Sequence, residues 1–195
     1  SGESGSGTVF FSGCTLGCVF CQNRDISAGG FGKEIDTARL REIFRELIAA
    51  GANNINLVSP TQFTPQILAA LDEPPAVPVV WNTGGYERVE TLRTLEGKVQ
   101  IYLPDLKYVS PELSCRYSGA ADYFETASQA ILEMYRQTGP YRMGEDGLLR
   151  SGVVIRHMML PGQLADTKRV IDWVAEQFAP GQVLFSLMSQ YTPIE

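Results

Sequence analysis

Apolar runs rich in β-branched and aromatic residues recur along the chain at regular intervals. Runs that are nearly continuous in apolar residues are typical of strands covered on both faces. Six segments fit this description and are predicted to be strands, at residues 8–13, 55–59, 77–83, 99–105, 152–160 and 182–189.

Amphipathic segments separate these runs. In the first of them Leu40, Phe44 and Leu47 fall on one face, and Gly51 ends the predicted helix. The repeated order of strand, helix and strand predicts an α/β fold with right-handed crossovers and a parallel sheet. Six strands at this length predict an open, partial (β/α)6 barrel rather than a closed barrel of eight. The helices are predicted at residues 37–50, 64–72, 87–95, 121–138 and 165–178.

The length of 195 residues suits a single domain with a sizeable core, so residues 1–195 are predicted to form one domain. Its first residues, 1–7 (SGESGSG), read as a flexible lead-in. The Gly-rich, polar stretch at 139–151 interrupts the pattern and is predicted to be a mobile excursion before the fifth strand.

Composition and charge narrow the function classes. The chain has 44% apolar and 19% charged residues, and 16 basic against 22 acidic side chains give a net charge of −6. This balance does not indicate a nucleic acid or an anionic membrane surface as partner. No apolar run approaches the roughly 18 residues of a membrane span, and no secretory signal pattern opens the chain. We expect a cytoplasmic protein with no nucleic-acid partner and no membrane contact.

Three of the four cysteines lie in one short stretch, SGCTLGCVFCQN, directly after the first strand. Because chemistry collects at the carboxyl ends of parallel strands, we expect Cys14, Cys18 and Cys21 at the mouth of the sheet. An irregular Gly-containing loop is a poor place for buried apolar thiols, and a reducing cytosol argues against disulfides. Zinc normally takes four ligands, and the single histidine, His157, lies far along the chain. The remaining Cys115 is isolated and reads as an ordinary thiol.

Three thiolates with gaps of three and two residues can hold three irons of a [4Fe–4S] cube, whose usual complement is four cysteines. The fourth iron then keeps an open site at which a cofactor or substrate can bind. The stretch CTLGCVFC resembles the C-x3-C-x2-C signature of the radical S-adenosylmethionine (SAM) superfamily. The resemblance implies that the free iron binds the amino and carboxylate groups of SAM. It also implies that an electron from a low-potential donor of flavodoxin or ferredoxin type cleaves SAM to a 5′-deoxyadenosyl radical, which abstracts hydrogen.

Further motifs narrow this resemblance. FFSGCTLGCVFCQN, LPDLKY and VVIRHMMLPG are similar to the activating enzymes of glycyl radical proteins, among them the pyruvate formate-lyase activating enzyme. INLVSPTQFTPQI, NTGGYE and SLMSQYTP are similar to a poorly characterised branch of homologues of those activases. The resemblance implies that Cys14, Cys18 and Cys21 ligate the cluster and that Phe20 and Gln22 flank the adenine.

The resemblance extends to the later strands. Asp105 and Lys107 match the Asp-x-Lys of the activases after strand four, and Arg156 matches their strand-five arginine. Where the activases carry Gly-Gly-Glu to receive the methionyl amine, this chain has Ser59, Pro60 and Thr61. Ser59 and Thr61 are therefore predicted to accept that amine through hydroxyl or carbonyl oxygens.

The positions and charges of these residues also indicate roles for them, independently of the resemblance. Asp105 and Lys107 are two positions apart, so in a continuing strand both point into the barrel mouth, as a functional pair or as a plain ion pair that closes the barrel. Arg156 lies within an apolar strand, where a guanidinium suits bidentate capture of a carboxylate such as that of the methionine moiety. His157 points to the opposite face and reads as structural.

Polar residues end two more strands. Asn82 and Thr83 precede a Gly-Gly pair that lets backbone approach a ligand closely, although a Gly-rich turn that caps the strand is an equal alternative. Gln190 follows the sixth strand, where the activases have polar cofactor contacts.

These residues are compatible with three alternative functions. The first is hydrogen abstraction from a glycine of a glycyl radical partner protein. The second is a radical SAM reaction on a small molecule or a peptide. The third is a non-enzymatic iron–sulfur or zinc binding module, which a fourth ligand would favour; the sequence shows none at a matching position.

Overall fold

A computed structural model describes residues 5–191, and its strands form one curved sheet in the order β1-β2-β3-β4-β6-β5, with β7 pairing with β6. Every pairing is parallel except that of β5 with β6. The sheet does not close on itself, and the predicted α/β fold with an open, partial barrel is confirmed. The strands are β1 Gly7–Phe10, β2 Ile55–Val58, β3 Val79–Thr83, β4 Ile101–Pro104, β5 Arg142–Met143, β6 Leu149–Met158 and β7 Leu184–Met188.

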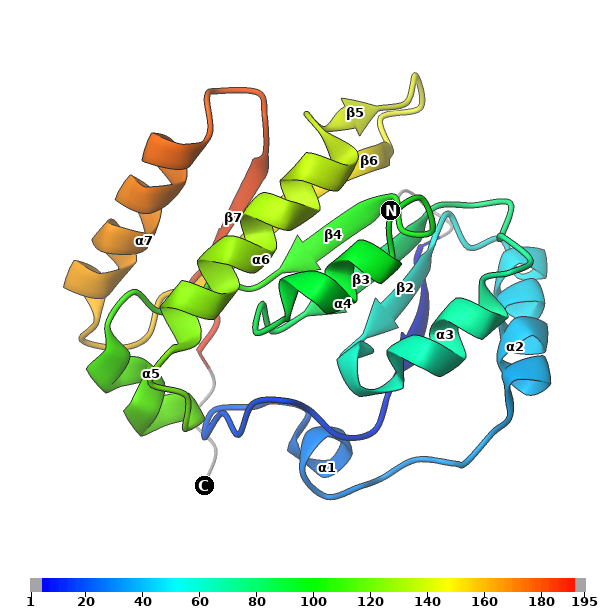
Figure 1. Ribbon diagram of the computed structural model, residues 1–195, viewed down its shortest axis with the longest axis horizontal. Coiled ribbons are helices and arrows are strands. Elements are labelled where there is room, and N and C mark those ends of the chain that lie inside the picture. The colour runs from blue at the N-terminus through cyan, green and yellow to red at the C-terminus, as the bar shows by residue number, and fades with distance from the viewer. Residues whose placement is uncertain (1–4, 192–195) are drawn as a thin grey trace.

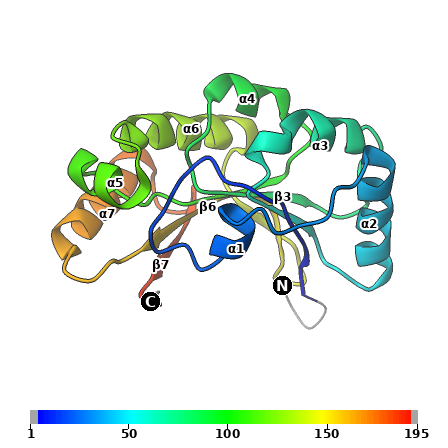
Figure 2. The same cartoon turned by 90° about the horizontal axis from the view of Figure 1, so that it is seen from below.

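The helices form an arc around one face of the sheet, and the opposite face has no such layer (Figure 2). All five predicted helices are present within the described residues, and the short α1 and α5 were not predicted. The helices are α1 Arg24–Ser27, α2 Thr37–Ala49, α3 Thr64–Ala70, α4 Val89–Thr94, α5 Pro111–Ser118, α6 Tyr123–Thr138 and α7 Leu164–Gln177, with a 3-10 turn, η1, at Thr61–Phe63.

The core lies between the sheet and the helices. Trp81 and Tyr102 from neighbouring strands are fully buried there, and so are Leu57 and Ile155. Every residue of β3 is buried, as its continuous apolar run predicted. This core fixes the strands, and their carboxyl ends converge on the side where α1 and the chain after β1 lie (Figure 1).

The first strand begins earlier than the sequence predicted. Residues 1–4 of the predicted lead-in lie outside the described residues, whereas Gly7 already pairs with Ile55 in the ladder of β1 and β2. The flexible lead-in therefore does not extend to Gly7. A side chain at Gly7 would meet Leu47 at 2.9 Å, so glycine is required there by packing against α2, which local sequence does not reveal.

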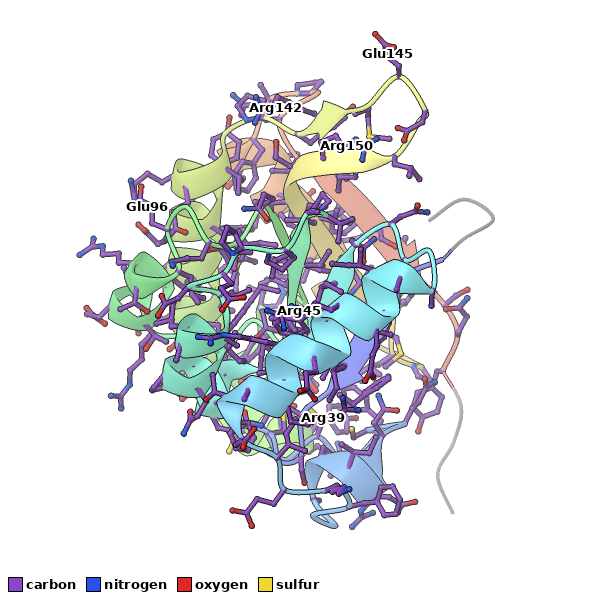
Figure 3. The ribbon with its side chains drawn as sticks, turned by 90° about the vertical axis from the view of Figure 1, so that its right-hand side faces the viewer. Arg39, Arg45, Glu96, Arg142, Glu145 and Arg150 are labelled. Carbon is purple, nitrogen blue, oxygen red and sulfur yellow. The ribbon has the colours of Figure 1, made fainter. Side chains whose placement is uncertain are left out.

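The predicted mobile excursion at 139–151 is wrong, because its two ends pair as a hairpin. Arg142 of β5 lies opposite Ser151 of β6, and Gly147 adopts a left-handed φ of +73° in the turn between them. Figure 3 shows Glu145 at the tip of this hairpin and Arg142 and Arg150 on its arms. Its glycines form a tight turn rather than a loose loop.

Helix α5 was missed although its end signals are in the sequence. The Ser110 hydroxyl accepts a hydrogen bond from Leu113 N–H at the N-cap, Pro111 occupies the first turn, and Gly119 ends the helix with a left-handed φ of +70°. Eight residues are too few for a periodic apolar pattern to stand out.

Across residues 5–191, the structure contains no helix of the length and apolar character that a membrane crossing requires.

Candidate active site

The carboxyl ends of the strands surround one cavity of about 460 Å³. Apolar side chains such as Phe10, Met158 and Met188 form part of its wall. All of the predicted site residues line it except Thr61. Those that do are Cys14, Cys18, Phe20, Cys21, Gln22, Ser59, Asn82, Thr83, Asp105, Lys107, Arg156 and Gln190.

The three clustered cysteines lie on the loop between β1 and α1, as the sequence predicted. Cys14 is exposed, Cys18 and Cys21 are half-buried, and none forms a disulfide. The Sγ atoms of Cys18 and Cys21 lie 3.0 Å from Ser118 Oγ and 3.2 Å from Ser27 Oγ. Leu16 N–H donates to Cys14 Sγ at 3.4 Å. Every thiol therefore has a hydrogen-bond partner on its protein side and still borders the cavity.

These thiols fit a cluster better than a single ion. Within residues 5–191 no three Cys, His, Asp or Glu side chains converge as ligands of one metal ion must. A [4Fe–4S] cube takes each thiolate on a different iron, so its ligands need not converge on one point. Cys115 is exposed on α5 and does not line the cavity. The donor set therefore fits a cube with three protein thiolates and one iron free of protein sulfur.

The same cavity is lined by three charged side chains, Asp105, Lys107 and Arg156, which we call the charged triad. Lys107 Nζ is 2.5 Å from Asp105 Oδ2, and Arg156 Nη2 is 2.8 Å from Asp105 Oδ1. Asp105 pairs with Arg156 in an isolated parallel bridge just beyond β4. The predicted ion pair is present, and it includes the strand-five arginine as well.

Charge–charge attraction keeps Asp105 and Lys107 ionised. Burial raises the pKa of Asp105, but attraction to Lys107 and Arg156 outweighs burial and holds this pKa below its usual value. Burial likewise lowers the pKa of Lys107, and attraction to Asp105 reverses the effect. One carboxylate thus faces two cations, which leaves a net positive charge beside the cavity.

Arg156 keeps binding capacity toward a ligand. Its Nη2 also donates to Asn82 Oδ1 at 2.8 Å, whereas its buried Nε has no hydrogen-bond partner among the described residues. An unpaired buried donor costs free energy unless a ligand or water satisfies it. The excess positive charge and the unpaired donor both fit an anionic group such as the carboxylate of SAM.

A buried glutamate that sequence reasoning did not single out ties two strand ends together. Glu87 is 1% exposed, and its Oε1 accepts hydrogen bonds from Thr61 Oγ1 at 2.6 Å, Thr83 Oγ1 at 2.5 Å and Trp81 Nε1 at 3.3 Å. Burial raises the pKa of Glu87, and these three donors offset only part of the effect. The signal that marks this residue is an acid two positions after the Gly-Gly pair that follows β3, in NTGGYE.

The contacts of Glu87 affect Thr61, one of the two residues predicted to accept the methionyl amine, and leave the other, Ser59, free of them. The Thr61 hydroxyl donates to Glu87, and Thr61 does not line the cavity. Ser59 does line it and has a left-handed φ of +54°, the one non-glycine residue with positive φ in residues 5–191. Such backbone geometry costs free energy and is often found at functional sites. Of the two predicted residues, Ser59 is the one in position to face a ligand.

Aromatic and amide side chains complete the cavity wall. The Phe20 ring packs edge-on against Tyr108 at 6.4 Å, and Lys107 Nζ lies 6.0 Å from its centroid. Gln22 and Gln190 also line the cavity, although they come from opposite ends of the chain. The adenine-flanking roles of Phe20 and Gln22 remain predictions.

His157 faces away from the cavity, as the alternation along β6 predicted. It is 2% exposed, its Nδ1–H donates to the Leu106 carbonyl at 2.7 Å, and its Nε2 accepts from Thr167 Oγ1 at 2.9 Å. Burial lowers the pKa of His157. This neutral imidazole anchors the segment after β4 to α7 and confirms the structural interpretation.

Comparison with known proteins assigns the chain to a family. Residues 8–174 match the family model of the radical SAM superfamily. Uncharacterized protein MJ0674 of Methanocaldococcus jannaschii is 30% identical over 202 residues, which cover 96% of this chain and 54% of that protein. The chain thus spans about half the length of this curated relative.

Solved structures show the same fold at low identity. SuiB of Streptococcus suis has a TM-score of 0.63 at 14% identity and 0.68 when bound to precursor peptide SuiA, over 96% of this chain and 41% of SuiB. Methylornithine synthase (PylB) has a TM-score of 0.58 at 15% identity, over 95% of this chain and 55% of that enzyme. The family match includes the cysteine loop and most of the sheet. The chain therefore belongs to the radical SAM superfamily, whose cofactors are a [4Fe–4S] cluster and SAM.

Proposed function

We propose that this chain is the catalytic core of a radical SAM enzyme that abstracts hydrogen from its substrate. The observation that carries the proposal is that the three cysteines and the charged triad line the same cavity at the strand ends. One wall supplies thiolates for an iron–sulfur cluster, and the other supplies an arginine for a carboxylate. When bound, the cluster and SAM together supply a 5′-deoxyadenosyl radical.

The roles of the residues follow from their contacts. Cys14, Cys18 and Cys21 hold the cluster, and Arg156 takes the methionyl carboxylate. Asp105 and Lys107 act in the site as a pair, since Asp105 orients both cations and offsets the repulsion between them. Asn82 Oδ1 is already used by Arg156 and the Thr83 hydroxyl by Glu87. The proposed acceptors of the methionyl amine are therefore Ser59 and nearby backbone carbonyls.

As substrate we propose a glycine residue of a partner protein, which makes the enzyme a glycyl radical activase. The support is the sequence resemblance and the open barrel, because the sheet does not close on itself at its two edges. A second candidate is a peptide or small molecule. The structural similarity to SuiB, which has been solved with a precursor peptide, favours the peptide. We place the enzyme in the cytoplasm with a flavodoxin or ferredoxin as electron donor.

The first experiment tests the chemistry without any substrate. Anaerobically reconstituted protein is reduced, mixed with SAM and assayed for 5′-deoxyadenosine. We expect slow formation of the nucleoside, which Cys14→Ala abolishes and Cys115→Ala leaves intact. A reconstituted cluster that neither changes its electron paramagnetic resonance spectrum with SAM nor cleaves it would favour the non-enzymatic binding module.

A second experiment distinguishes the substrates. The reduced enzyme is incubated with glycyl radical proteins encoded in the same genome, and a stable glycyl doublet is the expected result. Peptides and small molecules with deuterium at the target carbon are tested in parallel. If deuterium enters 5′-deoxyadenosine from one of these while no glycyl doublet forms, the activase assignment is wrong and the second candidate replaces it.

A further inference from the structure

The C-terminal end of α5 is joined to the middle of the cysteine loop, about a hundred residues away along the chain. Gly17 N–H donates to the Ser118 carbonyl at 3.4 Å, and Val19 N–H donates to the Tyr117 carbonyl at 2.9 Å. These backbone bonds flank Cys18. They bring the end of a helix that sequence analysis missed against a predicted cluster ligand.

A chain of three side chains continues this contact. Ser118 Oγ lies 3.0 Å from Cys18 Sγ and 3.0 Å from the hydroxyl oxygen of Tyr108. Ser118 is 3% and Tyr108 1% exposed, so both hydroxyls are shielded from solvent. Water cannot readily take the place of either group.

The number of protons fixes the direction of these hydrogen bonds once Cys18 binds iron. A ligating cysteine is a thiolate, which has no proton and can only accept. The Ser118 hydroxyl has a single proton and must give it to Cys18 Sγ. Its oxygen then accepts from Tyr108, whose phenol is protonated at neutral pH because its ordinary pKa is about 10.

We propose that Tyr108 and Ser118 form a hydrogen-bond relay to Cys18 that raises the reduction potential of the cluster. Reduction adds one negative charge, which spreads onto the thiolate sulfurs. A donor aimed at one of these sulfurs therefore stabilises the reduced cluster more than the oxidised one. Tyr108 strengthens the effect because a hydroxyl that accepts a hydrogen bond becomes a better donor.

The contact of Cys21 with Ser27 gives an internal comparison. Its Sγ–Oγ distance is 3.2 Å, but Ser27 is half-buried on the short α1. Water can replace a hydroxyl in such a place with little change in energy. We therefore assign the larger influence on the potential to Ser118.

The test is an anaerobic redox titration of the reconstituted protein, followed by the electron paramagnetic resonance signal of the reduced cluster. In Ser118→Ala we expect the ratio of reduced to oxidised cluster at a fixed potential to fall by up to about tenfold, because the difference in stabilisation between the two redox states is only part of the strength of a hydrogen bond to a charged group. For a one-electron couple a tenfold fall corresponds to a midpoint about 59 mV more negative. Tyr108→Phe should shift the midpoint in the same direction by less, and Ser27→Ala should shift it least.

Ser114→Ala is the matched control, since Ser114 is also buried on α5 but donates to the Pro111 carbonyl. Its midpoint potential should equal that of the unchanged protein. An unshifted Ser118→Ala with full iron content, or an equal shift in Ser114→Ala, would overturn the proposal. If Ser118→Ala does not retain its cluster, Tyr108→Phe decides, and an unchanged potential there refutes the relay. The readout requires no substrate, so it can fail while the proposed function stands.

Discussion

The two walls of the cavity are built in opposite ways. The charged triad lies at the ends of parallel strands, with the fully buried Trp81 and Ile155 in the core behind them. The cysteine wall is a loop that contains the four-residue α1, and its apolar Val19 and Phe31 are 57% and 74% exposed. The strand wall continues directly from the core, whereas the loop wall meets the core through a few side chains such as Leu16, Cys18 and Phe20.

This difference indicates that folding alone organises the strand wall, whereas cofactor binding helps to organise the loop wall. The strand wall is organised by burial of apolar surface and needs no ligand to form. The loop wall is held by the burial of Leu16 and by a few hydrogen bonds, such as those from Gln62 Nε2 to the carbonyls of Ser12 and Gly13. Metal binding contributes folding free energy where a site is not preformed. Substitutions in the loop should therefore affect the cluster, and substitutions at the strand ends should affect the fold.

The largest effect is expected for Cys18→Ala. The variant should lose the cluster completely, as measured by iron and sulfide analysis after anaerobic reconstitution. The free energy of unfolding of the cluster-free protein should change by less than about 1 kcal/mol, because the thiol is only half-buried. Cys115→Ala, on the exposed face of α5, should keep both the cluster and the stability. A large loss of stability in cluster-free Cys18→Ala would show that the contact of this side chain with the core stabilises the fold as strongly as the strand wall does.

Asp105→Ala should give the opposite result. Removal of the carboxylate leaves Lys107 and Arg156 as two partly buried cations without their partner, which costs on the order of 3 kcal/mol. Urea unfolding of the cluster-free protein measures this loss. Asp25→Ala, an exposed acid on α1 in the loop wall, should change stability by less than about 0.5 kcal/mol. Equal effects of the two substitutions would contradict the comparison of the walls.

The pH dependence of Asp105→Ala follows from the depressed pKa of this carboxyl. A group whose pKa is lower in the folded state contributes stability that is present above its unfolded value, here 3.8, and lost as pH falls through the folded value. The difference between the unchanged protein and Asp105→Ala should therefore be full at neutral pH and shrink below about pH 3.8. A difference that persists unchanged in acid would point to lost packing.

The sequence predicted the strand wall well because its signals are local. Continuous apolar runs located β2, β3 and β6, and polar residues at their ends located Asn82, Asp105 and Arg156. The cysteine spacing was equally local. These features depend on residues that are neighbours along the chain, which a pattern can detect.

The contacts that join distant segments were not predicted. Ser118 reaches the cysteine loop from a separate helix, and Glu87 takes the hydroxyl of Thr61 away from the cavity. Nothing near Ser118 or Thr61 in the sequence marks these partners, because the folded chain alone brings them together. The hairpin at residues 142–151 was missed for a related reason, since its glycines indicate flexibility until a pairing partner is known.

The next largest effect concerns the cofactor. Arg156→Ala should weaken SAM binding roughly ten- to a hundred-fold, since a charge-assisted hydrogen bond is worth about 1.5–3 kcal/mol. Equilibrium binding of SAM to the cluster-loaded protein measures this change, and iron content should stay normal. Arg45→Ala, an exposed arginine on α2 (Figure 3) that pairs with Glu73 and does not line the cavity, should bind SAM normally. Unchanged affinity in Arg156→Ala would return this arginine to a purely structural role.

The smallest expected effect is that of Glu87→Gln on stability. It tests whether the Glu87 carboxyl is neutral when it accepts its three hydrogen bonds. Burial raises its folded pKa, so its contribution to stability is fully present below the unfolded value of 4.5 and is lost as pH rises through the folded value. In Glu87→Gln the amide oxygen can accept the same three hydrogen bonds and does not titrate. The variant should therefore match the unchanged protein below about pH 4.5 and become relatively more stable as pH rises, as followed by urea unfolding across pH. Glu90→Gln, an exposed acid in the first turn of α4, should show no such trend. If Glu87→Gln is instead less stable at neutral pH, the strand wall requires the ionised carboxylate, and burial does not dominate at this position.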